Sequence, residues 1–416
     1  MPRTRDEVTV DFDHHTPARV LNPDLAYAEL RHSCPVAWSN AHDGFWVVSD
    51  YEDVVRVMKD HRYFSTSEGI TIPPPPYGQS ALIDFDPPMH TAYRRIMNAT
   101  LSKEVVHESL RPRIEHWANV FVDRVIESGR CDLVYDLAVT VPAAVTMEWL
   151  GWDKEDEWWP IGKAWHDLMS RPLGDAGFED AAQVVAWFDT RITEELAKRR
   201  EDPRDDTLSH VANMTIDGEP IPENHGISLV RLLVGAGVDT TTSLIGSALV
   251  HLHFHPGDRL RLTNEPELWT LATEEFLRRY SPVRTVARTC VKETELGGCV
   301  IKPGDRVLAS PGSANQDGSV FREPLRFEVD RAPNRHLGFG SGVHMCLGMH
   351  LARVEFEIVV RQVLARMPDY RVLEDELIDY SRQSVFTGWM KVPALFTPGA
   401  KAVPASSAPA GFELVH

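Results

Sequence analysis

The spacing of apolar residues along the chain has two different periods. From 88 to 200, apolar side chains recur every three or four positions, as in Ile114, Trp117, Phe121 and Val125. This spacing is typical of amphipathic helices. Further helices are predicted at 24–32, 51–60, 222–255, 266–280 and 349–365.

Short apolar runs between turn residues predict strands in two parts of the chain. The predicted strands are 45–48, 286–291, 295–301, 306–309 and 394–396. The pattern therefore favours a mainly α fold with a minor β part. No Pro/Gly/Ser linker or charge run divides the interior, so one large domain is expected over 1–396. The Pro/Ala/Ser-rich tail, 397–416, is expected to be disordered.

Charge and cysteine content narrow the class of protein. The formal net charge is −18, which argues against nucleic acid and anionic membranes as partners. Five cysteines have no zinc or redox spacing, and the polar N-terminus has no secretory apolar region. No uncharged apolar run has the length of a membrane span. We therefore expect a cytoplasmic protein without a membrane anchor.

A glycine-rich stretch with one cysteine precedes the predicted helix 349–365. From Phe339 to Gly348 it reads Phe-Gly-Ser-Gly-Val-His-Met-Cys-Leu-Gly. Glycines let this backbone turn tightly and approach a flat partner. The free amides that begin the following helix favour the thiolate form of Cys346, which binds metals. The alternative is a buried structural cysteine in a glycine turn.

The long helix 222–255 contains a second unusual segment, Gly-Ala-Gly-Val-Asp-Thr at 235–240. Glycine inside a helix costs about 1 kcal/mol relative to alanine, so two glycines require a reason. One reason is the approach of a planar group or a groove for water or O2, beside which Asp239 and Thr240 supply an acid and a hydroxyl. The other is tight packing against a neighbouring helix.

These motifs, in this order, resemble those of the cytochrome P450 superfamily. The cysteine stretch resembles its haem-binding loop, and 236–240 resembles its oxygen-binding segment. Glu275 and Arg278 with Arg331 resemble its structural charge cluster. The resemblance covers about 10–396 and implies a P450 fold, with one b-type haem between the helix of Thr240 and the loop of Cys346.

The resemblance also assigns roles to individual residues. Cys346 is the iron ligand, Thr240 takes part in proton delivery to bound oxygen, and Asp239 relays protons to it. The remaining cofactor contacts are His90, Arg94, Arg288 and His344 for the propionates, with Ala236, Gly237, Phe339 and Gly348 around the haem. Arginine suits a propionate because its planar fork binds a carboxylate through two hydrogen bonds.

The implied function is insertion of one oxygen atom from O2 into a small hydrophobic organic substrate. The chain has no flavin or iron–sulfur motif, so a ferredoxin and its NAD(P)H-dependent reductase are expected to supply electrons. Arg111, Arg113, Arg335, Arg353 and Arg361 are candidates for docking. The alternatives are a peroxygenase, an oxidative coupling or rearrangement enzyme, and a haem-thiolate sensor or electron carrier.

The expected substrate pocket is mainly apolar. Two of the residues expected to line it are Ile70 and Ile72, in a proline-rich segment, 69–78, that resembles the roof of the family's pocket. Arg284 either meets a substrate carboxylate or lies exposed on the surface.

Overall fold

A computed structural model describes residues 2–16, 23–74, 79–171, 175–380 and 385–402. The chain forms two compact units, each assembled from separate segments. The first unit contains 1–97, 274–347 and 381–387, and the second contains 98–273, 348–380 and 388–416. Helices hold 54% of the residues and strands 12%, which confirms the mainly α prediction.

The first unit is built on a six-stranded sheet with the order β1-β2-β3-β11-β8-β4. Its strands are β1 Thr9–Val10, β2 Val36–Ser39, β3 Phe45–Val48, β4 Phe64–Ser65, β8 Val286–Cys290 and β11 Arg306–Ala309. The β3–β11 pair is parallel, and the β11–β8 pair is antiparallel. Segments far apart in the sequence are thereby joined by backbone hydrogen bonds.

Helices and a hairpin complete the first unit. They are η1 Asp6–Val8, α2 Pro23–Ser33, α3 Tyr51–Lys59, β9 Thr294–Leu296, β10 Cys299–Ile301, α14 Pro311–Ala314 and η5 Gly342–His344. The predicted strand 295–301 is thus two strands joined at Gly297 and Gly298, which both have positive φ. Two helices begin in one unit and end in the other: α4 Met89–Thr100 and α13 Trp269–Tyr280.

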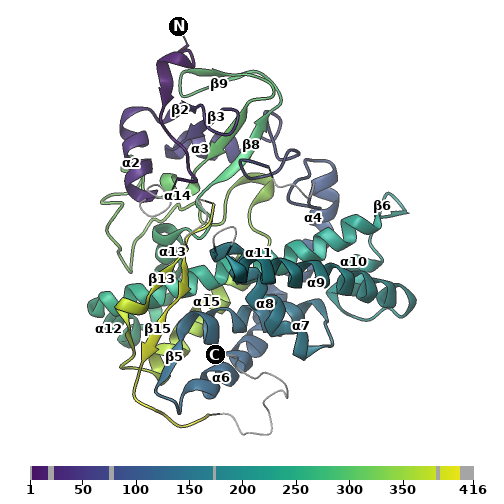
Figure 1. The fold of residues 1–416 in the computed structure, drawn as a ribbon, viewed down its shortest axis with the longest axis vertical. Helices are drawn as coiled ribbons and strands as arrows, with labels where there is room; N and C mark the ends of the chain where they lie inside the picture. Colours follow the sequence, from purple (N-terminus) through teal and green to yellow (C-terminus); the bar gives the residue numbers. More distant parts are fainter. Residues whose placement is uncertain (1, 17–22, 75–78, 172–174, 381–384, 403–416) are drawn as a thin grey trace. The chain divides into compact units, whose positions relative to one another are not determined.

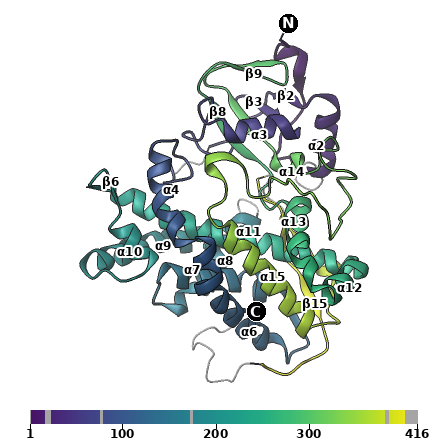
Figure 2. The same ribbon diagram turned by 180° about the vertical axis from the view of Figure 1, so that it is seen from behind.

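The second unit is helical. Its longer helices are α6 Arg111–Val125, α7 Thr140–Leu150, α8 Glu155–Ser170, α9 Ala176–Glu201, α10 Thr207–Ala212, α11 Glu223–Phe254, α12 Pro256–Asn264 and α15 Met349–Arg366. Its short helices are α5 Lys103–Val105, η2 Val106–Leu110, η3 Leu133–Ala138, η4 Pro266–Leu268 and η6 Glu374–Glu376. The long α11 contacts α7, α8, α9 and α15, so it is the central element of this unit (Figures 1 and 2).

Small sheets occupy other parts of the second unit. Their strands are β5 Arg130–Asp132, β6 Thr215–Ile216, β7 Glu219–Pro220, β12 Arg371–Val372, β13 Ile378–Asp379, β14 Trp389–Lys391 and β15 Pro393–Leu395. In the described start of the tail, the backbone amides of Thr397 and Ala402 donate hydrogen bonds to Asp369 and Asp123, and the disorder expected for the tail as a whole stays a prediction. Residues 403–416 lie outside the described part of the chain.

Two helical stretches are long and apolar enough to cross a membrane, Leu133–Leu150 and Glu223–Phe254. In their most apolar windows, 83% and 78% of the residues are buried inside the protein. Burial of this extent is what core helices of a folded protein show, because their apolar side chains pack against neighbouring helices.

The backbone of the cysteine loop is fixed within the first unit. The Cys346 amide donates to the Phe339 carbonyl oxygen at 2.9 Å. Gly342 has a φ of +80°, and a Cβ there would lie 2.8 Å from the Cα of Lys59 and 2.9 Å from the Met58 carbonyl oxygen. Only glycine lets the loop pass so close to the end of α3.

We expect Gly342→Ala to destabilise the protein more than Gly304→Ala, its matched control. Gly304 has a φ of +89°, but a Cβ there would meet no atom within 4 Å. The control carries only the left-handed backbone strain, about 1–2 kcal/mol. Alanine at position 342 adds overlap with backbone atoms. Urea unfolding midpoints would measure the difference, and equal midpoints would refute this account of the loop.

Candidate active site

Four basic side chains gather near the cysteine loop in the first unit. His90 and Arg94 lie one turn apart on α4, Arg288 lies on β8, and His344 ends η5. The rings of His90 and His344 have centroids 4.2 Å apart. The structure therefore brings together residues that are up to 254 positions apart in sequence.

Burial makes this group electrostatically unusual. Burial, followed by the positive charges of Arg288, His90 and Arg94, lowers the pKa of His344 to about 3. Burial and then Arg94 lower the pKa of His90 to about 4. Burial lowers the pKa of the Arg288 guanidinium to about 10. Each shift reports a buried basic group with too little negative charge around it.

The hydrogen bonds of this group are also incomplete. Both ring nitrogens of His90 are buried and have no partner among the described residues. Arg288 donates to the Ala287 carbonyl oxygen at 2.8 Å, and Asp84 and Asp86 partly offset its charge. Buried polar groups are normally paired. The arrangement therefore fits the two carboxylates of a haem, which would accept these bonds and balance the charge.

Cys346 itself is half-buried. Burial lowers the pKa of the nearby Arg94 guanidinium, and the field of Cys346 partly opposes this shift. Phe339 is half-buried as well, and its carbonyl oxygen closes the loop. Gly348, the residue before α15, belongs to the second unit, and a Cβ there would meet no atom within 4 Å. Packing among the described residues therefore does not explain why glycine stands at this position. The open space beside it can accommodate a ligand.

In the second unit, the predicted oxygen-binding segment lies in an unbroken stretch of α11. Ala236 is exposed although α11 is largely buried, and Thr240 is half-buried one turn later. The Thr240 hydroxyl donates to the Ala236 carbonyl oxygen at 2.8 Å. Such a bond loosens the helix locally. Two predicted site residues are therefore accessible in the middle of this largely buried helix.

The two glycines of this segment face neighbouring helices. A Cβ at Gly235 would lie 3.1 Å from the ring of Trp165, and one at Gly237 would lie 3.0 Å from Oγ1 of Thr146. Packing of α11 against α8 and α7 explains both glycines, which is the alternative that the sequence left open. The predicted contact of Gly237 with the haem stays a prediction.

Asp239 is buried in a hydrogen-bond network that the sequence did not reveal. Its Oδ1 lies 3.0 Å from Nδ1 of His166 and accepts a hydrogen bond of 2.7 Å from the Tyr380 hydroxyl. Nε2 of His166 lies 3.1 Å from the Met390 carbonyl oxygen. Burial and then Asp239 raise the pKa of Tyr380, so this hydroxyl stays a donor.

The partners of His166 determine where a proton must be. A carbonyl oxygen only accepts, so Nε2 of His166 carries a hydrogen. Its Nδ1 faces a carboxylate oxygen, so either Nδ1 or Asp239 must carry a second proton. The other carboxylate oxygen, Oδ2, is buried with no partner among the described residues. The network therefore holds a proton between His166 and Asp239, while Oδ2 has no hydrogen-bond partner among the described residues.

A second buried acid was also missed. Glu355 lies on the buried face of α15, and burial raises its pKa to about 8 although Thr241 donates a hydrogen bond to it. The sequence did contain a signal for this buried acid. Glu355 shares one face of the predicted helix with the apolar residues Leu351, Val354 and Ile358.

The predicted charge cluster is confirmed in the first unit. Glu275 and Arg278 are both fully buried, with Nε of Arg278 2.7 Å from Oε2 of Glu275. Nε of Arg331 lies 3.0 Å from the same oxygen. The cluster is structural, because its polar groups bond to each other and to backbone.

Two interpretations of the substrate pocket are wrong. Arg284 is buried and pairs with Asp24 at 2.6 Å, so it neither lies on the surface nor is free for a substrate carboxylate. Ile72 is buried in a core cluster with Phe12 and Tyr27. Residues 75–78 of the proline-rich segment lie outside the described residues.

Comparison with known proteins agrees with this geometry. The family model for cytochrome P450 matches residues 158–368. A steroid C26-monooxygenase of Mycobacterium tuberculosis is 31% identical, over 90% of this chain and 93% of the relative. A linalool 8-monooxygenase of Pseudomonas putida is also 31% identical, over 84% of this chain and 92% of the relative.

Among solved structures, cytochrome P450 PksS of Bacillus subtilis is similar with a TM-score of 0.82. It is 28% identical, and the match covers 93% of this chain and 100% of that one. The fold, the matched family model and relatives aligned over nearly their whole length agree. The chain belongs to the cytochrome P450 family and is a haem-binding monooxygenase.

Proposed function

We propose that this monooxygenase inserts an oxygen atom into a small hydrophobic organic molecule in the cytoplasm, with electrons from a ferredoxin and its reductase. The names of two relatives, acting on a steroid and on linalool, support a hydrophobic substrate. The observation that carries the site assignment is the buried basic group beside the cysteine loop, because it lacks the anions that a haem provides.

In the proposed site, Cys346 ligates the iron, while His90, Arg94, Arg288 and His344 hold the propionates. When bound, the thiolate-ligated haem supplies the chemistry that activates O2. Phe339 fixes the backbone of the cysteine loop through its carbonyl oxygen. Ala236, Gly237 and Gly348 are assigned to the haem by family resemblance.

Thr240 and Asp239 are proposed to deliver protons. Thr240 presents a hydroxyl on the exposed side of α11, and Asp239 holds or releases a proton through Oδ2. His166 and Tyr380 are positioning residues, because both bind Oδ1 and so fix the orientation of the carboxylate. A positioned acid raises the rate only when its geometry is held.

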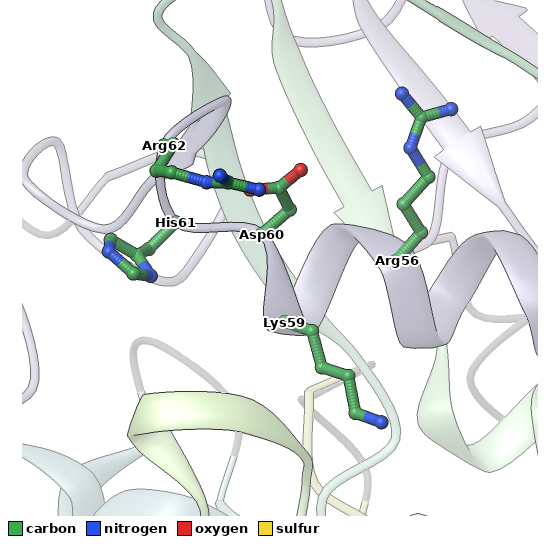
Figure 3. A pocket seen from close by; sticks show the side chains of 5 residues that line it. All are labelled: Arg56, Lys59, Asp60, His61 and Arg62. Atoms are coloured by element: carbon green, nitrogen blue, oxygen red, sulfur yellow. The ribbon is translucent and has the colours of Figure 1, made fainter.

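The docking surface for the electron donor is proposed from exposed basic side chains. Several candidates are compensated, since Arg111, Arg113 and Arg361 pair with Glu115, Glu148 and Glu357. An open pocket in the first unit adds a basic surface. Its lining comes from the end of α3 and the following turn: Arg56, Lys59, Asp60, His61 and Arg62 (Figure 3). Among these five described lining residues, Asp60 is the one acidic side chain, and it pairs with Arg62.

Replacement of the iron ligand tests the site. Cys346→Ser should abolish the shifted Soret band of the reduced CO complex, because that band depends on thiolate donation to iron. Cys34→Ser is the matched control, since Cys34 is a half-buried free cysteine of the same unit. If the serine variant kept the band, another residue would be the ligand.

Replacement of Tyr380 tests proton delivery. Tyr380→Phe should lower kcat and change its pH profile with little effect on KM, because Asp239 loses a donor that orients it. The amount of product formed per NAD(P)H consumed should fall in Tyr380→Phe. It should fall further in Thr240→Ala, and hydrogen peroxide should be released in place of product. Steady-state kinetics and oxidant assays measure both.

The matched control is Tyr370→Phe. Tyr370 is also buried in the second unit, but its hydroxyl donates to the Leu249 carbonyl oxygen at 2.8 Å. Its removal should leave the pH profile unchanged. If both tyrosine variants behaved alike, the effect would be structural. Full coupling in Thr240→Ala would favour the peroxygenase alternative, which hydrogen peroxide without redox partners would then test.

Partner dependence tests the electron route. The haem-loaded protein with NAD(P)H alone should not turn over, and added ferredoxin and reductase should restore product. Lys59→Gln should raise the KM for ferredoxin more at low than at high salt, because exposed charges are screened over about 8–10 Å near physiological ionic strength. Turnover without any partner would contradict the proposed route.

A further inference from the structure

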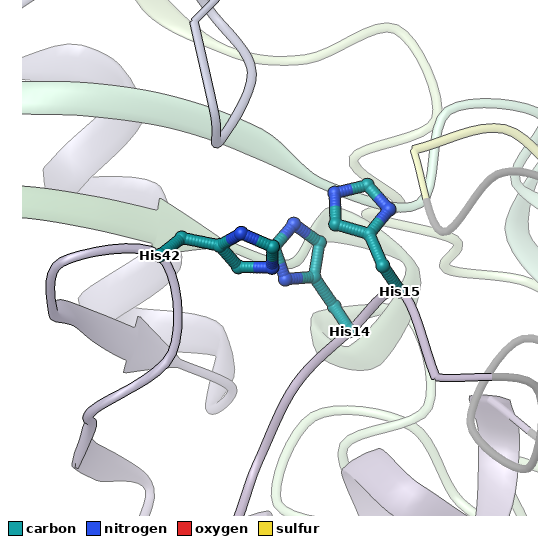
Figure 4. A group of neighbouring side chains, drawn as sticks. All are labelled: His14, His15 and His42. Carbon is teal, nitrogen blue, oxygen red and sulfur yellow. The ribbon is translucent and has the colours of Figure 1, made fainter.

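Three histidines of the first unit form a cluster that the monooxygenase reaction does not use. His14 and His15 follow β1, and His42 lies in the turn between β2 and β3. One ring nitrogen from each histidine lies within 4.8 Å of the other two (Figure 4). The ring centroids of His14 and His15 are 4.1 Å apart, and those of His15 and His42 are 5.3 Å apart.

His14 presents a buried lone pair to this cluster. Its side chain is 1% exposed, and its Nε2 donates to the Ile72 carbonyl oxygen at 3.0 Å. Nε2 therefore carries the hydrogen, and Nδ1 carries the lone pair. Nδ1 is buried and has no hydrogen-bond partner among the described residues. Burial, followed by His15 and His42, lowers the pKa of His14 to about 3, so the ring is neutral.

A carboxylate lies at the same place. Oδ1 of Asp13 is 3.0 Å from Nε2 of His42 and 4.0 Å from Nδ1 of His14. Burial opposes ionisation of Asp13, but hydrogen bonds from the His15 amide and from His42 lower its pKa overall. The cluster thus combines imidazole nitrogens with a carboxylate oxygen, the ligand types that zinc and similar ions prefer.

We propose that His14, His15, His42 and Asp13 bind a divalent transition metal ion, with zinc as the representative. In a tetrahedral zinc site the ligand atoms are about 3.4 Å apart, given Zn–N distances of about 2.1 Å. The histidine ligand atoms lie within 4.8 Å of one another, so metal binding would require side-chain rotations that bring them closer together. The metal would replace the hydrogen that His42 shares with Asp13.

The Ile72 carbonyl oxygen supports this site from outside the ligand set. It lies 3.0 Å from Nε2 of His14 and 2.7 Å from Nε2 of His15. A histidine that binds a metal through one nitrogen commonly donates its other N–H to a carbonyl or carboxylate, which fixes the ring. Metal binding would therefore join the segment 13–15, the β2–β3 turn and the backbone at Ile72.

The competing explanation is a purely structural cluster of hydrogen-bonded rings. Phe45 contacts His14 and His42 at centroid distances of 5.3 and 6.3 Å, so ring packing contributes. Packing does not provide a partner for Nδ1 of His14, however. A metal ion does.

Zinc binding to the haem-loaded chain, prepared without a polyhistidine tag and dialysed against a chelator, tests the proposal. Calorimetry with zinc chloride and metal analysis after gel filtration should show one tightly bound ion per chain. Zinc should also raise the unfolding midpoint, since an ion that binds only the folded state stabilises it. These readouts do not depend on monooxygenase activity.

His42→Gln should weaken zinc binding at least tenfold, because even residues behind the ligands commonly contribute 10- to 100-fold. His42 is exposed, so this change leaves the core intact. His15→Gln is a second variant in case the first one misfolds. His32→Gln, at an exposed histidine of α2, is the matched control and should bind like the parent.

Two outcomes would overturn the proposal. One is absence of a stoichiometric zinc ion in the parent. The other is equal affinity in His42→Gln, His15→Gln and the parent, which would place the ion at another histidine group.

Discussion

The group of buried basic side chains around Arg288 is the constraint on which the site depends. Arg288 is 3% exposed, so its guanidinium loses its hydration and must regain that free energy from anions and acceptors. Among the described residues, Arg288 has a backbone acceptor and the fields of two aspartates. The first unit therefore contains a buried positive charge that a bound anion would balance. A haem that delivers two carboxylates would complete the folding of this region as well as bring the iron.

The Glu275 cluster in the same unit shows the opposite condition. Arg278 is fully buried too, but all of its N–H groups have acceptors: Glu275 and the backbone carbonyl oxygens of Asn315, Pro324 and Arg326. Its charge is compensated inside the protein, so it requires no ligand. The two arginines thus differ in compensation: the charge of Arg278 is balanced within the protein, whereas that of Arg288 is balanced only in part, which supports the proposal that Arg288 binds an anionic group.

In the second unit, the residue proposed to deliver protons on α11 is an acid, in contrast to the basic group of the first unit. Asp239 is buried on α11, and His166 and Tyr380 hold one of its oxygens while the other has no partner. This difference between the two oxygens of one carboxylate supports the proposal that Asp239 exchanges a proton through Oδ2. Glycines in the same helix allow α7 and α8 to approach closely, which places His166 of α8 within reach of Asp239.

The sequence by itself determined the mainly α fold class, most helices and strands, the cysteine loop and the residues of the basic group. Helical periodicity, glycine spacing and the cysteine motif are local properties of the chain, whereas the residues of the basic group were identified by resemblance to the family. The tertiary structure decided which distant side chains meet. The partner of Arg284 is Asp24, 260 positions away, and the partners of Asp239 are 73 and 141 positions away. Such pairings, like the histidine cluster of His14, His15 and His42, depend on how strands and helices from remote segments pack. No local pattern records that.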